Sequence, residues 1–421
     1  MASYAQCLVC DDCGREFSLR DALNTCPACG GLLEVRYDMA AMRRGVHSLA
    51  SCEQTRSIWR YGQFLPPVQE ENIVTLGEGG TPLTPSVHIG PALGLKHLYF
   101  KNDTMMPTGS FKDRGFSLAV SYAKEIGVQN GFTYSSGNAG ASFSAYASRG
   151  GFRALVCVEY VASQTKMAMI NLYGARTAIL EFERFAQIEE MLSRASRELN
   201  LYQFVNFINP IRHEAMKTYA YEIVEALGCA PDAMFHPVGT GGGLWGAWKG
   251  YCELEALGMT DRRPRMYCVQ PAVTAHFRQA FARGEREAAP YGDPTQTIAQ
   301  SIAADSPLHG GRRILKAVYE SDGAALGVSE EEILQALRDL AHERLPGHQR
   351  LERRRQGRRI RAQRAAVHGL VYQKRLAQGR AAAVHHENAI AAYALARQHG
   401  GLIGAAQARG TGDAQHAFAR R

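Results

Sequence analysis

The sequence predicts an α/β protein built on parallel sheets. Between about Leu76 and Val269, short runs rich in β-branched and aromatic residues alternate with amphipathic stretches of helical periodicity. This alternation is typical of βαβ units, in which helices cover both faces of a parallel sheet. Two loops of small polar residues also fall at strand-to-helix turns, where ligands bind on such sheets. We therefore expect strands at 131–134, 154–158, 177–180, 233–235 and 266–269, and a capping box, Ser329-x-x-Glu332, predicts a further helix.

Length and composition set the broad class. The chain has 421 residues, of which 46% are apolar, enough for two ordinary domains and a small additional module. No uninterrupted apolar run approaches ~18 residues, so we expect no transmembrane helix and no membrane partner. Residues 1–6 lack the basic and apolar parts of an export signal. Together with cysteines expected to be reduced, this predicts a cytoplasmic protein.

The segment 107–115 contains the most informative lysine. Lys112 lies between turn-forming residues and an Asp-Arg pair, immediately before a stretch of helical periodicity. The positive end of a helix dipole and the neighbouring Arg114 both disfavour an ammonium, which predicts a lowered pKa for Lys112. A lysine that is partly neutral can form a Schiff base with an aldehyde. The alternative is an ordinary surface lysine at a helix start.

Two further loops are suited to an anionic ligand. Residues 135–140 (Ser-Ser-Gly-Asn-Ala-Gly) follow an expected strand, and their backbone N–H groups can converge on an anion or a carboxylate. Within that loop, Asn138 adds an amide that both donates and accepts. Residues 237–244 (Pro-Val-Gly-Thr-Gly-Gly-Gly-Leu) open an amphipathic helix and are typical of a phosphate-binding turn. Ordinary turn chemistry is the alternative for both loops.

The glycine run also has the spacing of a dinucleotide-binding turn, Gly241-x-Gly243-x-x-Gly246. Such a site needs an acidic residue at the end of the next strand to hold a ribose hydroxyl. The next expected strand, 266–269, ends instead in Gln-Pro. No Gly-Lys-Ser/Thr follows the run either, which excludes a Walker-type loop. The sequence therefore favours a phosphate group other than that of a dinucleotide or a nucleoside triphosphate.

A lysine, a Ser-Ser-Gly-Asn loop and a separate glycine-rich turn together resemble the fold-type II pyridoxal-phosphate enzymes, and most closely the threonine synthase family. Residues 76–83 (Leu-Gly-Glu-Gly-Gly-Thr-Pro-Leu) are similar to the opening signature of that family, and residues 110–115 (Ser-Phe-Lys-Asp-Arg-Gly) to its lysine motif. The resemblance extends over roughly residues 5–343. It implies a two-domain fold similar to that of tryptophan synthase β, within a catalytic region at 39–343 whose smaller subdomain spans roughly 110–215.

The resemblance also implies an activity, a substrate and an assembly. Threonine synthases convert O-phospho-L-homoserine and water into L-threonine and phosphate through aldimine chemistry on pyridoxal 5'-phosphate. This makes the expected partner a small-molecule amino acid, and the expected assembly is a homodimer.

The roles of individual residues follow from the same resemblance. Lys112 would bind the cofactor and move protons, and Asn138 would meet the ring hydroxyl of the cofactor. The cofactor phosphate would be held by the glycine run, which consists of Gly239, Thr240, Gly241, Gly242 and Gly243. The substrate carboxylate would lie on Ser135, Ser136 and Gly137. Candidates for binding the substrate phosphate are Arg114, Lys101 and Lys166.

The cysteines near the N-terminus predict a zinc ribbon at residues 5–38. The pairs Cys10-x-x-Cys13 and Cys26-x-x-Cys29 each have the two-residue spacing and trailing glycine of a zinc knuckle. Four thiolates in a tetrahedral array suit a structural zinc ion and leave no open position for catalysis. Cys7 could compete for the metal, and a ribbon that has lost its metal is the alternative. Such a ribbon heads many members of the family that the chain resembles.

Residues 344–421 differ in composition from the rest of the chain. They contain 15 Arg and one Lys against three acidic residues, a net charge of +13. Since the whole chain carries +8, residues 1–343 carry about −5. A basic arm for nucleic acid is one interpretation, although few aromatic residues accompany the arginines, and a solvated extension is another. We favour a third, a segment translated out of frame, because the Thr-Gly-x-Gly-Leu-Lys-like closing segment of the resembling family is missing.

Two other functions compete with threonine synthesis. The first uses the same chemistry: a threonine or serine dehydratase, or another β- or γ-replacement enzyme of the pyridoxal-phosphate group. The second is an inactive scaffold that binds nucleic acid through its zinc ribbon and basic tail. The intact Lys112, Asn138 and glycine run argue against the second, so a nucleic-acid partner is not expected.

Overall fold

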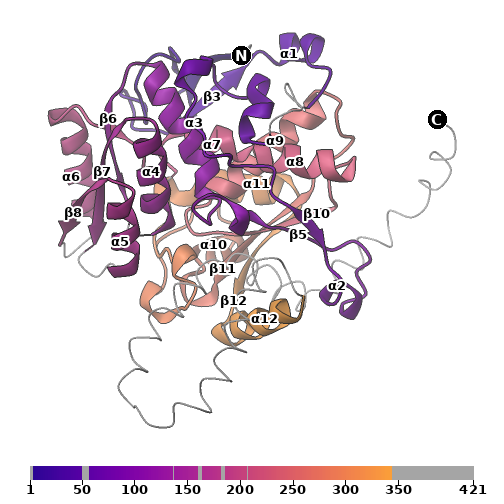
Figure 1. Ribbon diagram of the computed structural model, residues 1–421. Coiled ribbons are helices and arrows are strands. Elements are labelled where there is room, and N and C mark those ends of the chain that lie inside the picture. Colours follow the sequence, from indigo (N-terminus) through magenta and orange to yellow (C-terminus); the bar gives the residue numbers. More distant parts are fainter. Residues whose placement is uncertain are drawn as a thin grey trace, which may run out of the picture.

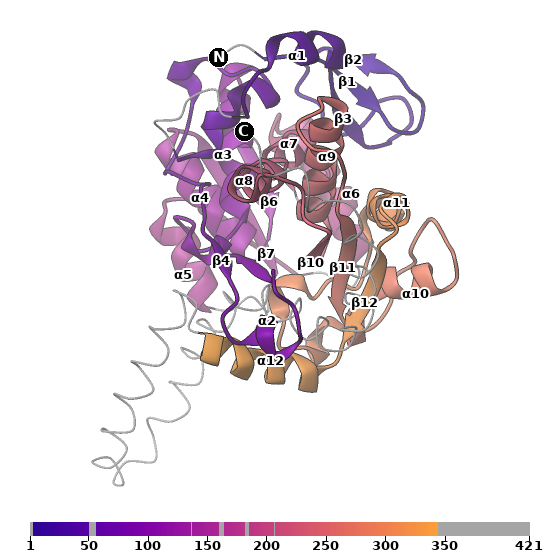
Figure 2. The same ribbon diagram turned by 90° about the vertical axis from the view of Figure 1, so that its right-hand side faces the viewer.

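The computed structural model describes residues 3–49, 56–135, 137–159, 164–181, 185–205 and 207–343. This part of the chain contains a small antiparallel ribbon, a two-stranded antiparallel pair and two parallel sheets. The ribbon and helix α12 (Glu330–Glu343) lie at opposite ends of the molecule in Figure 1 and in Figure 2. The two parallel sheets lie between these ends.

The N-terminal ribbon consists of three short strands. Strand β1 (Ala5–Cys10) pairs antiparallel with β2 (Glu16–Phe17) on one side and with β3 (Leu33–Tyr37) on the other. The glycines that trail the two Cys-x-x-Cys pairs, Gly14 and Gly30, have φ of 69° and 76°. Glycine adopts this left-handed conformation without the steric penalty of a Cβ atom, which explains why both knuckles end in glycine.

The ribbon is joined to the rest of the protein by a buried interface. The Tyr37 hydroxyl donates to Oε2 of Glu214 at 2.7 Å, and Nζ of Lys249 donates to the Val35 carbonyl at 2.7 Å. Glu214 lies on α7 (Pro210–Met216) and Lys249 on α9 (Gly242–Ala256). Apolar ribbon residues, among them Val35, also belong to the core that surrounds helix α3 (Lys112–Glu125). The ribbon is therefore packed against the helices that carry the candidate site.

The first parallel sheet has the strand order β8-β7-β6-β9. Its strands are β6 (Asn130–Tyr134), β7 (Arg153–Glu159), β8 (Arg176–Leu180) and β9 (Tyr202–Gln203). Helices α3 (Lys112–Glu125) and α4 (Asn138–Arg149) contribute to the core on one face. On the other face, Leu192 of α6 (Phe185–Glu198) packs with Phe132 and Cys157. Figure 1 shows this sheet at the left, between α6 and α4.

The second parallel sheet has the order β10-β11-β12. Its strands are β10 (Ala233–Pro237), β11 (Arg265–Pro271) and β12 (Ala324–Val328). Met266 on one face packs in a core with Leu244 of α9 and Ile314 of α11 (Arg312–Glu320). Val269 on the other face packs with Ile333 and Leu340 of α12. Both sheets are thus covered on two faces, as parallel sheets require.

The remaining elements of the described part connect these layers. They are α1 (Met39–Gly45), β4 (Leu83–Pro85), α2 (Ile89–Ala92), β5 (Tyr99–Lys101), α5 (Gln164–Leu172), α8 (Thr218–Leu227), α10 (His276–Ala282) and seven short 3₁₀ segments. Among the described residues, no helix is both long enough and apolar enough to cross a bilayer.

The five expected strands are all present, as β6, β7, β8, β10 and β11. The expected capping box at Ser329 is also present: its hydroxyl accepts from the Glu332 N–H, and Glu332 Oε2 accepts from the Ser329 N–H at 2.8 Å. Strands β9 and β12 of the parallel sheets are not among the expected strands, and β9 has only two paired residues, which give no periodic signal. Ser136 and residues 344–421 lie outside the described residues, so the interpretations of the tail stay untested.

Candidate active site

Lys112 is the first residue of α3, as the sequence predicts. The preceding turn includes Gly109 with φ of 78°, and the Ser110 hydroxyl accepts from the Lys112 N–H at 3.3 Å. The side chain is half-buried, and its Nζ lies 4.3 Å from the centre of the Phe111 ring. The amine is therefore held against an aromatic face at a helix start.

The pKa of Lys112 is lowered to about 7. Burial makes the largest contribution, and the positive charge of Arg212 adds to it. The direction is the one that the sequence predicts, but the charged neighbour is Arg212 and not Arg114. At pH 7 a substantial fraction of the molecules thus carries the neutral amine.

Arg114 lies in a buried ionic network behind Lys112. Its side chain is fully buried, and the guanidinium forms ion pairs with Asp103 at 3.0 Å and with Glu222. Lys101 joins the network through Glu222 at 2.5 Å. Oε1 of Glu222 also accepts from the Gly80 N–H at 3.0 Å, so the network ties residues 76–83 to the lysine motif. The guanidinium of Arg114 is therefore already paired with two carboxylates, which favours a structural role over the expected contact with substrate.

The Ser-Ser-Gly-Asn loop is held to the lysine motif by Asp113. One carboxylate oxygen of Asp113 accepts from the Ser142 hydroxyl at 2.6 Å, and the other accepts from the Thr108 N–H at 2.7 Å. Ser142 lies one turn into α4, which begins at Asn138. The Ser135 hydroxyl accepts from the Gly137 N–H at 3.1 Å. Asn138 and Lys112 are therefore the first residues of two helices that Asp113 holds together.

The glycine run leads into the expected helix, α9, which begins at Gly242 within the run. The preceding Gly241 has φ of 90°, and a Cβ atom there would lie 2.3 Å from Cδ1 of Ile314. No side chain caps the first turn of this 15-residue helix. Its N-terminal N–H groups and dipole therefore suit an anion such as a phosphate.

Phe111 brings the lysine motif to the glycine run. A Cβ atom at Gly243 would lie 3.4 Å from Cε2 of Phe111 and 2.6 Å from Cε1 of His236. His236 is buried at the end of β10, and burial lowers its pKa to about 4, so the ring is neutral at pH 7. The residue next to Lys112 thus lies beside the turn that would hold a phosphate. This geometry fits pyridoxal phosphate, which requires an amine for its aldehyde and a cradle for its phosphate.

Arg212 is a further candidate for the site that the sequence does not single out. It is 4% exposed, it donates from Nη1 to the Phe204 carbonyl at 2.9 Å, and its Nε has no hydrogen-bond partner. Among the described residues, no carboxylate forms an ion pair with it. Burial lowers the pKa of its guanidinium to about 9, so the group stays charged at pH 7. A buried cation without a carboxylate partner is suited to an anionic ligand.

Lys166 is the other lysine expected to bind the substrate phosphate. Its side chain lies outside the described residues, so this expectation stays a prediction.

Thr240 and Gly239 precede α9, and a Cβ atom at Gly239 would lie 3.2 Å from the Ile302 Cα atom. The glycine run is thus packed closely against two other segments, those of Ile302 and Ile314.

The four predicted zinc ligands are brought together. The Sγ atoms of Cys10, Cys13, Cys26 and Cys29 all lie within 4.8 Å of one another. Cys10 and Cys29 are 3.4 Å apart, and Cys13 and Cys26 are 3.7 Å apart. Four thiolates at ~2.3 Å from a tetrahedral zinc ion would be about 3.8 Å apart, so the arrangement fits zinc. The potential competitor Cys7 is not part of this cluster.

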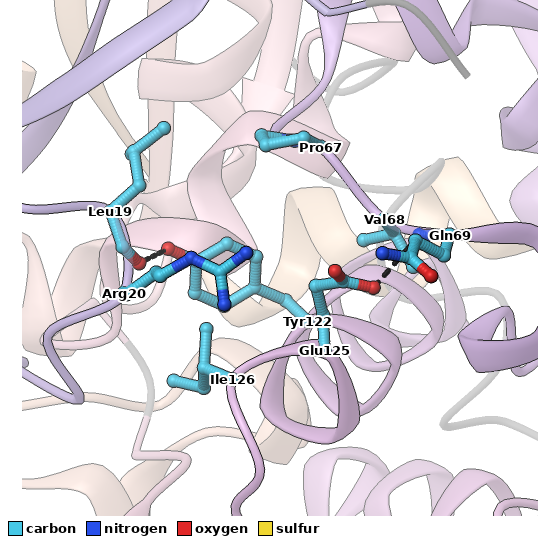
Figure 3. A pocket seen from close by; sticks show the side chains of 8 residues that line it. All are labelled: Leu19, Arg20, Pro67, Val68, Gln69, Tyr122, Glu125 and Ile126. Carbon is cyan, nitrogen blue, oxygen red and sulfur yellow. Dashed lines mark hydrogen bonds between the residues drawn. The ribbon is translucent and has the colours of Figure 1, made fainter.

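A surface cavity of about 230 Å³ lies where the ribbon meets α3 (Figure 3). Its lining includes Arg20 of the ribbon and Glu125 of α3, and the Tyr122 hydroxyl donates to the Leu19 carbonyl across it. Tyr122 and Glu125 are near the C-terminal end of α3, whereas Lys112 opens that helix. At 1.5 Å per residue, the cavity lies roughly 15–20 Å along the helix from the lysine and is separate from its site.

Comparison with known proteins finds similarity to pyridoxal-phosphate-dependent enzymes and, among them, to threonine synthases. A family model described as "Pyridoxal-phosphate dependent enzyme" matches residues 74–347. The threonine synthase of Methanocaldococcus jannaschii is 36% identical over 334 residues, which are 79% of this chain and 81% of that protein. The threonine synthase of Methanosarcina acetivorans is 34% identical over 336 residues, again 79% and 81% of the two chains.

Solved structures show the same fold. Maize serine racemase is 21% identical, with a TM-score of 0.53 over 61% of this chain and 74% of that one. Serine racemase from Dictyostelium discoideum is 24% identical, with a TM-score of 0.51 over 61% and 78% of the two chains. These likenesses confirm the expected fold class, an α/β fold of the fold-type II pyridoxal-phosphate enzymes.

Proposed function

The chain belongs to the threonine synthase family of pyridoxal-phosphate-dependent enzymes, and we propose that it converts O-phospho-L-homoserine and water into L-threonine and inorganic phosphate. Membership of this family makes the chain a pyridoxal-phosphate-dependent lyase. The observation that carries the proposal is the position of Lys112, a partly neutral amine whose neighbour Phe111 lies beside the glycine run.

The cofactor, when bound, supplies the electron sink that acidifies the hydrogen on the α-carbon of an amino acid. Lys112 is suited to accept that proton at Nζ, because a general base works best with a pKa near the working pH. The contact between Asp113 and Ser142 places the lysine motif and the Asn138 turn at the starts of two joined helices, α3 and α4. We assign proton transfer in this site to Lys112.

The glycine run and Asn138 are assigned to the cofactor. Gly239, Thr240, Gly241, Gly242 and Gly243 would surround its phosphate at the N-terminus of α9, where the helix dipole favours negative charge. Asn138 would meet the ring hydroxyl through its amide. The substrate carboxylate would lie on the loop formed by Ser135, Ser136 and Gly137.

Arg212 is assigned to the substrate. O-phospho-L-homoserine carries a phosphate that threonine lacks, and a buried cation near Lys112 is suited to bind it. The guanidinium of Arg212 has a free Nε and no ion pair among the described residues, whereas that of Arg114 is bound by two carboxylates. We therefore propose that Arg212 binds the substrate phosphate and that Arg114 holds the lysine motif in place.

The cysteine cluster is assigned to a structural zinc ion. The four sulfur atoms lie at the spacing that a tetrahedral ion requires, and four protein ligands leave no position for a substrate. We propose that the ribbon at 5–38 uses this ion for stability, that the catalytic region is 39–343, and that the protein is a homodimer.

Two assays on the full-length protein test this function. We expect phosphate release from O-phospho-L-homoserine, and no comparable formation of a 2-oxo acid from threonine or serine. Lys112→Ala should abolish phosphate release, while Lys96→Ala, which changes an exposed lysine, should leave it unchanged. Formation of the 2-oxo acid as the main activity would instead establish a dehydratase, and our proposal would be wrong.

A further inference from the structure

Arg313 connects the zinc ribbon with the helix that carries Arg212. It lies on α11 and is 4% exposed. Its Nε donates to Oδ2 of Asp11 at 2.7 Å, and its Nη2 donates to the Leu33 carbonyl at 2.9 Å. Asp11 lies inside the first knuckle, next to the cluster member Cys10. One buried guanidinium thus holds the knuckle and the strand β3 together.

The third nitrogen of Arg313, Nη1, determines which ring nitrogen of His213 carries the proton. Nη1 of Arg313 lies 3.2 Å from Nδ1 of His213. A guanidinium can only donate, so Nδ1 must accept. Burial and three neighbouring cations hold the pKa of His213 well below its usual range, and the ring is therefore neutral. A neutral ring that accepts at Nδ1 must carry its proton on Nε2.

The Nε2–H group of His213 lies beside the glycine run. The side chain is 3% exposed, and Nε2 has no hydrogen-bond partner among the described residues. A Cβ atom at Gly242 would lie 3.4 Å from Cδ2 and 3.6 Å from Nε2 of this ring. Gly242 is the first residue of α9, whose first turn has no side-chain cap. The protonated edge of His213 therefore packs against the turn assigned to the cofactor phosphate.

We propose that Asp11, Arg313 and His213 link the four-cysteine cluster to the glycine run, so that the ion held by the cysteines tightens the binding of the cofactor phosphate. Arg313 and His213 act as positioning residues in this linkage, which rests on the function proposed above.

The physical basis of the linkage is the order that an ion imposes on the knuckle. A zinc ion with four thiolates carries a net charge of −2 and fixes the backbone on both sides of Asp11. Asp11 then holds Arg313, and Arg313 holds the orientation of the His213 ring. When the His213 ring is already oriented, its Nε2–H group faces the glycine run before the cofactor arrives. Binding of the cofactor phosphate then does not have to order the ring, which raises the affinity. By reciprocity, the bound cofactor also tightens metal binding.

The neighbouring Arg312 provides a matched control. Its Nη1 pairs with Asp12 of the same knuckle at 2.8 Å, so it also joins α11 to the ribbon. Its side chain, however, is 46% exposed. Within the described part of the chain, the contact to His213 comes from Arg313 and not from Arg312, so the loss of Arg312 removes a ribbon contact without breaking the proposed linkage.

The test measures the affinity of the full-length protein for pyridoxal phosphate, followed by the visible absorption of the lysine-bound cofactor. Each variant is titrated before and after removal of metal with a chelator. We expect metal removal to weaken the affinity of the wild type about 10-fold, within the range of typical couplings between sites. Metal-loaded His213→Leu and Arg313→Gln should already bind the cofactor about 10-fold more weakly, with little further change after chelation. Arg312→Gln should behave as the wild type.

The outcomes separate this proposal from the proposed function. An equal affinity of the wild type with and without metal overturns the linkage, and so does a His213→Leu protein that keeps the full metal dependence. Cysteines that bind no ion also overturn it. If Arg313→Gln does not fold, His213→Leu alone decides, because it leaves the contact between Arg313 and Asp11 in place. Absence of any Lys112-dependent absorption band, in contrast, contradicts the proposed function itself.

Discussion

Two buried arginines lie near Lys112, and their surroundings differ. Arg114, on the same helix as the lysine, forms ion pairs with Asp103 and Glu222. Arg212, on α7, forms no ion pair among the described residues and has a free Nε. The paired arginine is part of the framework, whereas the unpaired one is suited to a ligand. Proximity to the lysine in sequence does not distinguish these roles, but the presence of carboxylate partners does.

The difference in ion pairing also predicts different effects of the two arginines on stability and on activity. Removing one partner of a buried ion pair leaves the other charge buried and uncompensated, which destabilises the fold. Removing an unpaired cation leaves no such charge behind. We therefore expect Arg114 to matter most for stability and Arg212 most for activity.

Arg114→Leu should have the largest effect on folding. The substitution leaves Asp103 and Glu222 without their cation, and we expect the free energy of unfolding to fall by about 3–5 kcal/mol. Denaturant unfolding followed by circular dichroism measures this change. A loss below ~1 kcal/mol would mean that the network contributes little and would contradict the comparison.

Arg212→Leu should mainly affect catalysis. We expect kcat/KM for O-phospho-L-homoserine to fall by about 10²–10³-fold, because a charge-assisted contact to the substrate phosphate is lost. The free energy of unfolding should change by no more than about 1 kcal/mol. Steady-state phosphate release and denaturant unfolding of the same preparation supply both values. A large loss of stability with unchanged kcat/KM would reverse the roles of the two arginines.

The lowered pKa of Lys112 should be visible in its reaction with the cofactor. The neutral amine is the reactive form, so covalent capture of pyridoxal phosphate by cofactor-free protein should speed up as the pH rises through about 7. Between pH 6 and pH 8 we expect a rise of about 10-fold that levels off. An ordinary lysine, with a pKa of about 10.4, would show a rise of about 100-fold without a plateau. Stopped-flow absorbance distinguishes the two, with Nα-acetyl-lysine as the reference amine.

The smallest effect concerns the shape of the glycine run. Gly241 and Gly228 both have positive φ, but only at Gly241 would a Cβ atom meet a neighbour, Ile314. Alanine at either position introduces the strain of a left-handed conformation. Gly241→Ala should destabilise the protein by about 1 kcal/mol more than Gly228→Ala, because it also crowds a buried side chain. Equal losses in thermal unfolding would show that the turn has room to relax.

Local features of the sequence were sufficient to predict much of the site. Lys112 is flanked by turn-forming residues and helical periodicity, and the cysteine pairs carry their spacing and glycines with them. These signals lie within a few residues, so they predict the start of α3 and the cluster of four cysteines without knowledge of the fold. Most strands of the two parallel sheets were also predicted, because each is a short apolar run bounded by turn-forming residues.

The role of Arg212 could not be predicted in this way. It depends on the packing of α7 near α3, across about 100 residues of chain, and a single arginine shortly after Asn-Pro gives no local signal. The ion pairs of Arg114 are equally remote, since Glu222 follows it by 108 residues. Tertiary packing decides which of the two cations is paired with carboxylates. For the same reason the expected neighbour Arg114 is wrong, and Arg212 is the cation that lowers the pKa of Lys112.

The most direct test of the central claim is the visible absorption spectrum of the full-length protein supplied with pyridoxal phosphate, recorded beside Lys112→Ala and Lys96→Ala. We expect a band of lysine-bound cofactor in the wild type and in Lys96→Ala, and none in Lys112→Ala. A folded wild-type protein without the band, or a band that survives in Lys112→Ala, would contradict the assignment of this site to pyridoxal phosphate.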